Sequence, residues 1–376
     1  MRIAVIGAGG SGSAALRFLA EAGHQAVAFE QFAIGHAMGS SHGHSRIIRH
    51  SYPDEFHTRL MRSAYDLWDD LERESGENLL VKCGGITFGP ADDATLQDTL
   101  RSLVSAGIDH EILDREQSAA RFPAIDIGEG KIAVYQKDSG FLKSSQCLRT
   151  QIDIAAKHGA EIREHCAVTA VEEKDGKVLV STAGTTEEFD AAIITAGPWI
   201  GRLLAPLKLP ITTALRQVAY LAIRRNPENF APGKLPVWIE HPSDHYGFPS
   251  DGRIDGIKIA SHGAGMPYDP DEPDRPLMPE PLENLVLHAR KLFPDLSGEV
   301  VSTQSCLYTI TPDENFIVDH APGSRRIVLC SGCSGHGFKF TILLGRMIAD
   351  MATGTNPAAA PAPWRLGRFR LRDGQP

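Results

Sequence analysis

The sequence predicts an α/β protein with two domains, one built on a parallel sheet and the other rich in mixed β-structure. Three observations support this fold class. A glycine-rich turn links an apolar strand to a helix near residue 7, a second apolar strand occupies residues 191–199, and a strand–turn–helix pattern returns after residue 325. Residues 212–317 are typical of short strands separated by turns. A chain of 376 residues with 42% hydrophobic content can bury two such cores.

The first element pair, in IAVIGAGGSGSAALRFLAEAGHQAVAFEQ, is typical of a Rossmann-type dinucleotide-binding unit. Gly7 permits the tight turn, Gly9 lets a pyrophosphate approach the backbone, and Gly12 lets the helix pack closely on the strand. The helix N-terminus supplies free N–H donors for phosphates, and Gly23 is the expected end of the helix. Glu30 closes the second strand, where it can accept hydrogen bonds from a ribose. The motif does not distinguish NAD from FAD.

The middle of the chain continues with alternating elements. We expect an amphipathic helix in YDLWDDLERES, short strands near CGGITFG and a second helix in SSQCLRTQIDIAAKHG. A hairpin in VTAVEEKDGKVLVSTAG precedes the buried strand AAIITAGPW, which returns to the parallel sheet.

The last third completes both domains. RRIVLCSGCSGHGFKFTILLGRMIADMATG predicts a strand, a glycine-rich turn and a long helix, and the Pro–Ala tail from residue 356 is expected to form a surface strap with a short basic end. The cofactor domain is therefore expected to be discontinuous. We expect it to comprise residues 1–80, 143–211 and 318–376, with a substrate domain of residues 81–142 and 212–317.

Composition excludes several classes of function. A net charge of -9 argues against a general nucleic-acid or membrane-surface partner. No apolar run approaches the roughly 20 residues of a membrane span, and a strand begins at the N-terminus, so we expect a cytoplasmic protein. The six cysteines are expected to be reduced thiols. Cys330 and Cys333 have C-x-x-C spacing but lack a second pair nearby, so we expect no metal.

The segment GSSHGHSRIIRH, residues 39–50, concentrates histidines and arginines in an acidic chain. If the segment is helical, His42, Arg46 and Arg49 share one face while Ile47 and Ile48 pack inward. That face is suited to an anion, because arginines bind carboxylates through bidentate, charge-assisted bonds. The alternative is a solvated basic helix face.

Four separated motifs, taken in order, carry a family resemblance. GAGGSG, GSSHGHSRIIRH, CLYTITPDENFIVD and SGHGFKF together resemble the monomeric sarcosine oxidase group of flavoprotein amine oxidases, which includes N-methyltryptophan oxidase and pipecolate oxidase. The resemblance runs nearly end to end. It implies FAD, a glutathione-reductase-like FAD domain, a mixed-sheet substrate domain and a monomer. The implied reaction is oxidation of a sarcosine-like N-methyl or cyclic amino acid, with O2 reduced to hydrogen peroxide.

The resemblance also implies roles for individual residues. The implied catalytic residues are Lys258, on the oxygen-reacting face, with His42, Arg46 and His262. The implied substrate-binding residues are Arg49, Tyr246, Tyr308, Gly335 and Lys339. The implied cofactor-binding residues are Gly7, Gly9, Gly12, Glu30, Ser40, Ser41, Gly337, Phe338 and Cys306, the last through a covalent bond to FAD. Without the resemblance, Lys258 and Lys339 would be interpreted as surface lysines, His262 and Tyr246 as structural residues, and Cys306 as an inert thiol.

One position departs from the family pattern, and alternatives remain open. His44 stands where the family has an acidic residue, which leaves the charge of the substrate pocket undecided. The chain could be a dehydrogenase with another electron acceptor, or an oxidase of larger amines such as fructosyl amino acids. It could also be a flavin- or nucleotide-binding module without turnover.

Overall fold

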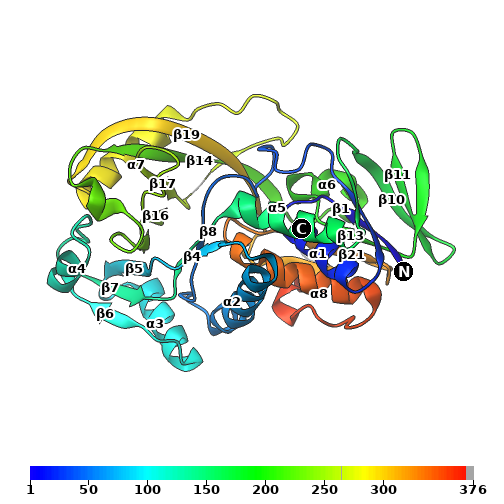
Figure 1. Ribbon diagram of the computed structural model, residues 1–376, viewed down its shortest axis with the longest axis horizontal. Helices are drawn as coiled ribbons and strands as arrows, with labels where there is room; N and C mark the ends of the chain where they lie inside the picture. The colour runs from blue at the N-terminus through cyan, green and yellow to red at the C-terminus, as the bar shows by residue number, and fades with distance from the viewer. Residues whose placement is uncertain (264, 370–376) are drawn as a thin grey trace, which may run out of the picture.

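The computed structural model describes residues 1–263 and 265–369. The two largest sheets lie towards opposite ends of the long axis of the molecule, with the chain crossing between them several times (Figure 1). In the described residues, no helix combines the length and the apolar character that a membrane crossing requires.

The first large sheet is the expected parallel one. Its strands, in spatial order, are β20 (Ile317–His320), β21 (Ile327–Ser331), β13 (Ala191–Ile194), β1 (Arg2–Ile6), β2 (Gln25–Phe29) and β9 (Glu161–Arg163). All neighbours are parallel except β20, which runs antiparallel to β21. The strands predicted around the first glycine turn, within residues 191–199 and after residue 325 are thus confirmed as members of one sheet. The second of these stretches is a strand only over Ala191–Ile194, because Gly197–Trp199 form a 3-10 turn.

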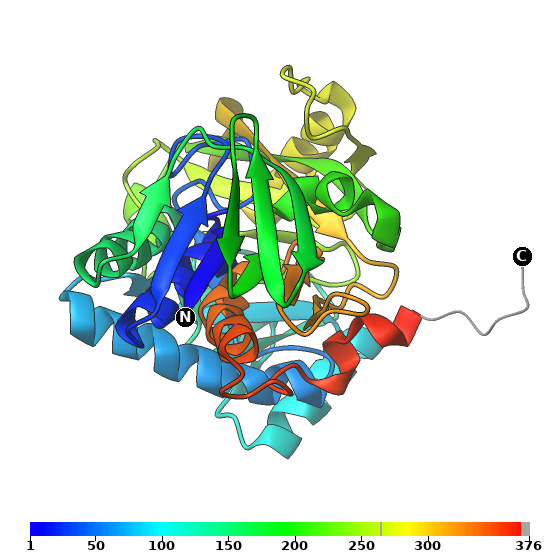
Figure 2. The same ribbon diagram turned by 90° about the vertical axis from the view of Figure 1, so that its right-hand side faces the viewer.

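The two faces of this sheet are covered differently. Ile3 and Val5 face helices α1 (Gly10–Glu21), α2 (Glu55–Ser75), α5 (Ser144–Lys157) and α8 (Thr341–Thr353). Ala4 and Ile6 face a three-stranded sheet of β10 (Val168–Lys174), β11 (Lys177–Thr182) and β12 (Thr186–Phe189). The predicted hairpin is therefore confirmed and gains a third strand, seen in green at the front of Figure 2. The alternation of buried residues follows from the two-residue period of a strand covered on both faces.

The second large sheet is mixed. From one edge its strands are β18 (Met266–Pro267), β14 (Thr212–Ile223), β17 (Ile257–Ser261), β16 (His245–Gly247), β15 (Val237–Glu240), β5 (Gly85–Pro90), β7 (Lys131–Gln136) and β6 (Glu111–Leu113), and β19 (Leu296–Ile310) also pairs with β14. Only β15 and β5 are parallel to each other. Its core includes residues of α7 (Pro279–Leu292), and the other helices of this region are α3 (Ala94–Ala106) and α4 (Arg115–Arg121).

Each large sheet draws its strands from separate stretches of chain, and on this basis we propose the two-domain division given above. One boundary needs adjustment. The division at residues 317/318 would cut β20, so we place it before Ile317. The remaining elements are short: α6 (Ile200–Leu203) and 3-10 turns at Gly197–Trp199, Ala205–Leu207, Pro227–Phe230, Phe338–Phe340, Ala362–Trp364 and Leu366–Phe369.

The expected helix in the basic segment is wrong. Residues 39–45 form bends, with Gly43 at a φ of 98°, and Arg46–Ile48 form strand β3. That strand pairs with β8 (Gly140–Leu142), which also pairs with β4 (Leu80–Val81). Glycine at positive φ breaks a helix, and the adjacent β-branched Ile47 and Ile48 favour a strand.

The C-terminal tail is more than a surface strap. Trp364 is fully buried, and its ring packs against Phe56, Phe316 and Phe340. This anchor ties the tail to the core formed with α2 and α8. The basic end of the tail from residue 370 onward lies outside the described residues.

Candidate active site

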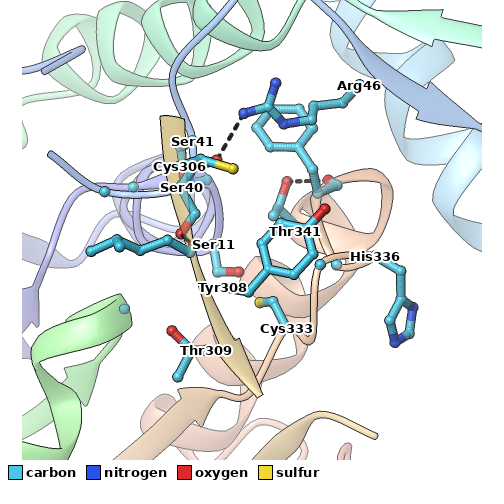
Figure 3. Close-up of a pocket in the computed structure, with 18 of the residues that line it drawn as sticks. Ser11, Ser40, Ser41, Arg46, Cys306, Tyr308, Thr309, Cys333, His336 and Thr341 are labelled. Atoms are coloured by element: carbon cyan, nitrogen blue, oxygen red, sulfur yellow. Dashed lines mark hydrogen bonds between the residues drawn. The ribbon is translucent and has the colours of Figure 1, made fainter. Parts of the chain in front are cut away.

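A cavity of about 610 Å³ extends from the first glycine turn to the second large sheet. Its lining includes every residue named above for the site except Gly12. Gly12 instead has the packing role expected of it, because a Cβ there would lie 1.9 Å from the carbonyl oxygen of Gly7. Figure 3 shows Arg46 of β3 around the same space as Cys306 and Tyr308 of β19, which lies far along the chain from β3.

The glycine turn forms one end of the cavity. Gly7 has a φ of 93°, and a Cβ there would lie 2.6 Å from the carbonyl oxygen of Thr195, so only glycine fits. Helix α1 begins after Gly9, which has no side chain to cap it. Ser41 Oγ accepts a hydrogen bond from the N–H of Gly10, and in the described residues the next N–H groups, those of Ser11 and Gly12, have no acceptor and are available to an anion. Glu30 accepts hydrogen bonds from the backbone N–H groups of Ala8 and Phe32, both at 3.0 Å. Burial would raise the pKa of Glu30, but these bonds and His36 hold it below its usual value.

The basic segment forms the middle of the cavity wall. Ser41 Oγ accepts a hydrogen bond of 2.9 Å from the N–H of Gly10, and the Arg46 guanidinium donates to the carbonyl oxygen of Ser40 at 3.0 Å. Nε2 of His42 is buried without a hydrogen-bond partner. Burial, together with the charge of Arg46, lowers the pKa of His42 to about 3, so this histidine is neutral at neutral pH. His50 adds no charge either, because burial lowers its pKa to about 4.

Lys258 on β17 projects into the cavity, so the interpretation as an exposed strand lysine is wrong. It is 5% exposed, and its Nζ donates to the carbonyl oxygen of Ser45 at 3.0 Å. Ile257 and Ile259 point the other way into the core of the second sheet, as the alternation predicts. Burial, with the charge of Arg46, lowers the pKa of Lys258 to about 7.

Cys306 on β19 lies in the same part of the cavity. All six cysteines are free thiols, as expected, and Cys306 is half-buried. Burial raises the pKa of Cys306, while Arg46 and Lys258 oppose that shift. Cys330 and Cys333 also contact the cavity, and burial raises the pKa of Cys333 to about 11.

Two further cations, Arg49 and Lys339, also line the cavity. Lys339 lies in the 3-10 turn Phe338–Phe340, before α8 rather than in its first turn, and it is 5% exposed rather than a surface lysine. Burial, with the charge of Arg49, holds the pKa of Lys339 well below its ordinary value. Among the described residues, no carboxylate oxygen lies within 4.0 Å of either cation.

Two tyrosines and a histidine, Tyr246, Tyr308 and His262, also line the cavity. The hydroxyl groups of Tyr246 and Tyr308 are 3.3 Å apart, and the ring of His262 lies 5.5 Å from that of Tyr308. Burial, with the charge of Arg216, lowers the pKa of His262 to about 4. Gly335 has a φ of 80°, and a Cβ there would lie 2.0 Å from Tyr308, so glycine is required for the chain to pass these rings.

His44, which departs from the family pattern, is not part of the cavity lining. Its Nδ1 lies 3.3 Å from a guanidinium nitrogen of Arg253. The departure therefore does not place a charge on the cavity wall.

Sequence reasoning missed several lining residues. Tyr52, His241, Asp244, Thr309 and His336 all contact the cavity. Position in a motif could have indicated two of them, because Tyr52 follows the basic segment and His336 lies inside SGHGFKF.

A second group of titratable side chains lies outside the cavity. Glu240, His245 and His288 have potential ligand atoms within 4.8 Å of one another. The two imidazole rings stack in parallel planes, 3.9 Å apart and at 13°, so their nitrogen lone pairs do not converge on one point. Glu240 instead binds Lys131 at 2.5 Å and also accepts hydrogen bonds from His288 and Ser243. We interpret this group together with Lys131 and Ser243, called here the Glu240 cluster, as an ion-pair network around the buried carboxylate of Glu240.

Comparisons with known proteins identify the family of this chain. The family model described as FAD dependent oxidoreductase (DAO) matches residues 2–351. The chain is 32% identical to a monomeric sarcosine oxidase of Streptomyces avermitilis, covering 97% of both chains. It is 33% identical to an N-methyl-L-tryptophan oxidase of Shigella dysenteriae, covering 97% of this chain and 98% of the relative. The structure of NikD, an amino acid oxidase of nikkomycin biosynthesis, has the same fold, with a TM-score of 0.86, 22% identity and 96% of each chain covered.

Proposed function

The chain belongs to the DAO family of FAD-dependent oxidoreductases, and from that premise we propose that it oxidises a small amino acid carrying a secondary amine. N-methylglycine is the simplest candidate. The observation that carries this proposal is the pair of cavity-lining cations, Arg49 and Lys339, which face the cavity without an acidic partner in the described residues. An α-amino acid supplies the missing carboxylate.

The residues present fit FAD. The glycine turn and the uncapped start of α1 suit a pyrophosphate, and Glu30 at the end of β2 suits a ribose. The orphaned Nε2 of His42 and the adjacent Arg46 suit the polar edge of a ring system. FAD bound there would supply the two-electron redox chemistry: a hydride equivalent would leave the carbon beside the amine nitrogen, giving an imine that water hydrolyses, and O2 would take up the two electrons as hydrogen peroxide.

Substrate binding is assigned to the end of the cavity that holds both cations. Arg49 and Lys339 bind the carboxylate by charge-assisted hydrogen bonds, and we call this pair the carboxylate clamp. The same cations disfavour a further positive charge nearby, so the substrate nitrogen is held without its extra proton. His262 is neutral at neutral pH and can accept a hydrogen bond from that nitrogen.

Two further assignments concern the cofactor and oxygen. We propose that Cys306 forms the covalent bond to FAD, because it is the cavity thiol that stands beside Arg46 and Lys258. Lys258 in its protonated form supplies a positive charge, held by the carbonyl oxygen of Ser45, where O2 acquires negative charge, and preorganised charge of this kind lowers a barrier without reorganisation.

The proposal is tested by mixing the holoenzyme anaerobically with a panel of amines and recording flavin absorbance. N-methyl and cyclic amino acids are expected to bleach the flavin, and admission of O2 should restore the colour with formation of hydrogen peroxide. Bleaching without return of colour in O2 would indicate a dehydrogenase. Absence of bleaching by every amine would overturn the proposal in favour of a binding module.

A further inference from the structure

Tyr52 stands between the two arms of the carboxylate clamp. It lies just beyond the basic segment and is 5% exposed. The face of its ring packs against the Arg49 guanidinium, with Cζ of Arg49 4.6 Å from the ring centroid. Its hydroxyl accepts a hydrogen bond of 2.7 Å from Nζ of Lys339. One side chain therefore contacts both cations, through its π-face on one side and its oxygen on the other.

His336 fixes the direction of this hydrogen-bond chain. Nε2 of His336 lies 3.0 Å from the carbonyl oxygen of Glu314, which can only accept, so Nε2 carries the proton. Nδ1 lies 3.0 Å from the hydroxyl oxygen of Tyr52. Burial, with the charge of Lys339, holds the pKa of His336 well below its ordinary value, so the ring is neutral and Nδ1 is an acceptor. The Tyr52 hydroxyl therefore donates to Nδ1 of His336 and keeps a lone pair for Lys339.

The donors of Lys339 are then largely assigned. Its ammonium has three N–H groups. One goes to the hydroxyl of Tyr52 and a second to the carbonyl oxygen of His336, both at 2.7 Å. One N–H remains for a ligand. A flexible lysine head with two fixed bonds presents its third donor in a defined direction, which lowers the entropy lost when a carboxylate binds.

We propose that Tyr52 is a positioning residue for the carboxylate clamp: it holds the Lys339 ammonium through its hydroxyl and the Arg49 guanidinium through its ring, with its hydroxyl oriented by His336. The inference rests on the proposed function, because it assumes that Arg49 and Lys339 bind a carboxylate. Tyr52 itself does not contact the reacting atoms.

The experiment measures binding of two probes to the holoenzyme by isothermal titration calorimetry. The probes are 2-furoate, which carries a carboxylate, and 2-furamide, a neutral molecule of similar shape. In Tyr52→Phe the ring under Arg49 stays and the bond to Lys339 is lost. The dissociation constant for 2-furoate is expected to rise about tenfold while that for 2-furamide changes less than about twofold. With the amino acid substrate, KM should rise while the limiting rate of flavin reduction stays within about threefold.

Tyr65→Phe is the matched control. Tyr65 is also buried, and its hydroxyl donates one hydrogen bond of 3.1 Å to the carbonyl oxygen of Asp138, but it does not line the cavity. This variant should bind both probes as the wild type does. If Tyr52→Phe keeps the wild-type preference for 2-furoate, the positioning role of Tyr52 is overturned, while carboxylate binding by Arg49 and Lys339 is still supported. If the wild type itself does not prefer 2-furoate to 2-furamide, the clamp fails and the role of Tyr52 fails with it.

Discussion

The carboxylate clamp and the Glu240 cluster both place charged groups inside the protein, but they balance charge differently. Glu240 is 4% exposed and is neutralised within the protein by Lys131, with further hydrogen bonds from His288 and Ser243. Within the part of the chain that the structure describes, Arg49 and Lys339 have only neutral hydrogen-bond partners: Ser51 Oγ for Arg49, and Tyr52 Oη and the His336 carbonyl oxygen for Lys339. In the first arrangement the charge of Glu240 is balanced without a ligand, although Nδ1 of the neighbouring His245 has no hydrogen-bond partner in the described residues. In the second arrangement the charges are not balanced in this way.

This difference separates structural charge from functional charge. A buried ion is costly unless it is paired, so a fully paired cluster contributes to a stable fold. Cations that face a cavity without a counter-ion reduce stability in the absence of ligand and are retained for what they bind. The same reasoning extends to Lys258, whose only hydrogen-bond partner is the carbonyl oxygen of Ser45. Substitutions at the cavity cations should therefore impair binding or reaction and leave the free energy of unfolding nearly unchanged. Substitutions in the Glu240 cluster should lower the free energy of unfolding and leave the flavin reaction unchanged.

The largest expected effect is at Cys306. After acid precipitation, the wild-type pellet should stay yellow, and Cys306→Ser should release nearly all of the colour into the supernatant. Cys83→Ser is the matched control, because Cys83 is a buried free thiol outside the cavity lining. A colourless wild-type pellet would show that the flavin is not covalently bound.

The next effect is at Lys258. Replacing it by methionine removes the charge and keeps much of the shape, so reoxidation of the reduced enzyme by O2 should slow by about two orders of magnitude or more. Anaerobic reduction by substrate should change much less. Lys131→Met, in the Glu240 cluster, should leave both rates unchanged and lower the free energy of unfolding. Stopped-flow recording of the two half-reactions checks this, and a wild-type reoxidation rate in Lys258→Met would remove the lysine from oxygen activation.

Arg49→Ala should weaken binding of a carboxylate inhibitor by about ten- to hundredfold, since a hydrogen bond between charged groups is lost. Flavin retention should be unaffected. The free energy of unfolding without ligand should stay within about 0.5 kcal/mol of the wild type or rise, because an unpaired cation is removed. Titration with 2-furoate and a urea denaturation curve measure the two quantities. An unchanged dissociation constant would place the carboxylate elsewhere.

Glu240→Gln should show the opposite signature, with flavin reduction by substrate unchanged and the free energy of unfolding reduced by about 2 kcal/mol. Burial would raise the pKa of Glu240, but hydrogen bonds from His288, Lys131 and Ser243 lower it to about 2, against 4.5 for an ordinary glutamate. Because the folded-state pKa is the lower one, this stabilisation is present above about pH 4.5 and is lost as the pH falls towards 2. The difference in stability between wild type and variant should therefore be smaller at about pH 4 than at about pH 7. An equal difference at both values would show that the carboxylate charge is not what stabilises the cluster.

Much of the fold could be predicted because its signals are local. The strands flanking Gly7 and the end of β2 at Glu30 follow from apolar runs, glycine positions and one acidic residue within a short window. The structure of the basic segment could not be predicted in this way. Its charge spacing is compatible with a helix, whereas the strand β3 depends on β8, which lies far along the chain.

The same limit applies to the site. Arg49 and Lys339 were predicted through motifs, but the burial of Lys339 could not be, because its contacts are with Tyr52, which lies 287 positions away in the chain, and with the carbonyl oxygen of His336. Tyr52 and His336 were missed because their importance lies in a contact between residues separated by 284 positions. Sequence patterns identify the groups that carry charge, and only the folded chain shows which of those charges remain unpaired.

The unpaired carboxylate clamp is expected to select a carboxylate on the substrate. The most direct measurement compares anaerobic flavin bleaching by N-methylglycine and by N-methylglycinamide, which lacks only the negative charge. In the wild type, the concentration that gives a half-maximal bleaching rate should be at least about tenfold higher for the amide than for N-methylglycine. In Arg49→Ala, the ratio of these two concentrations should approach one. Equal half-maximal concentrations for the two compounds in the wild type would contradict selection of a carboxylate by the clamp.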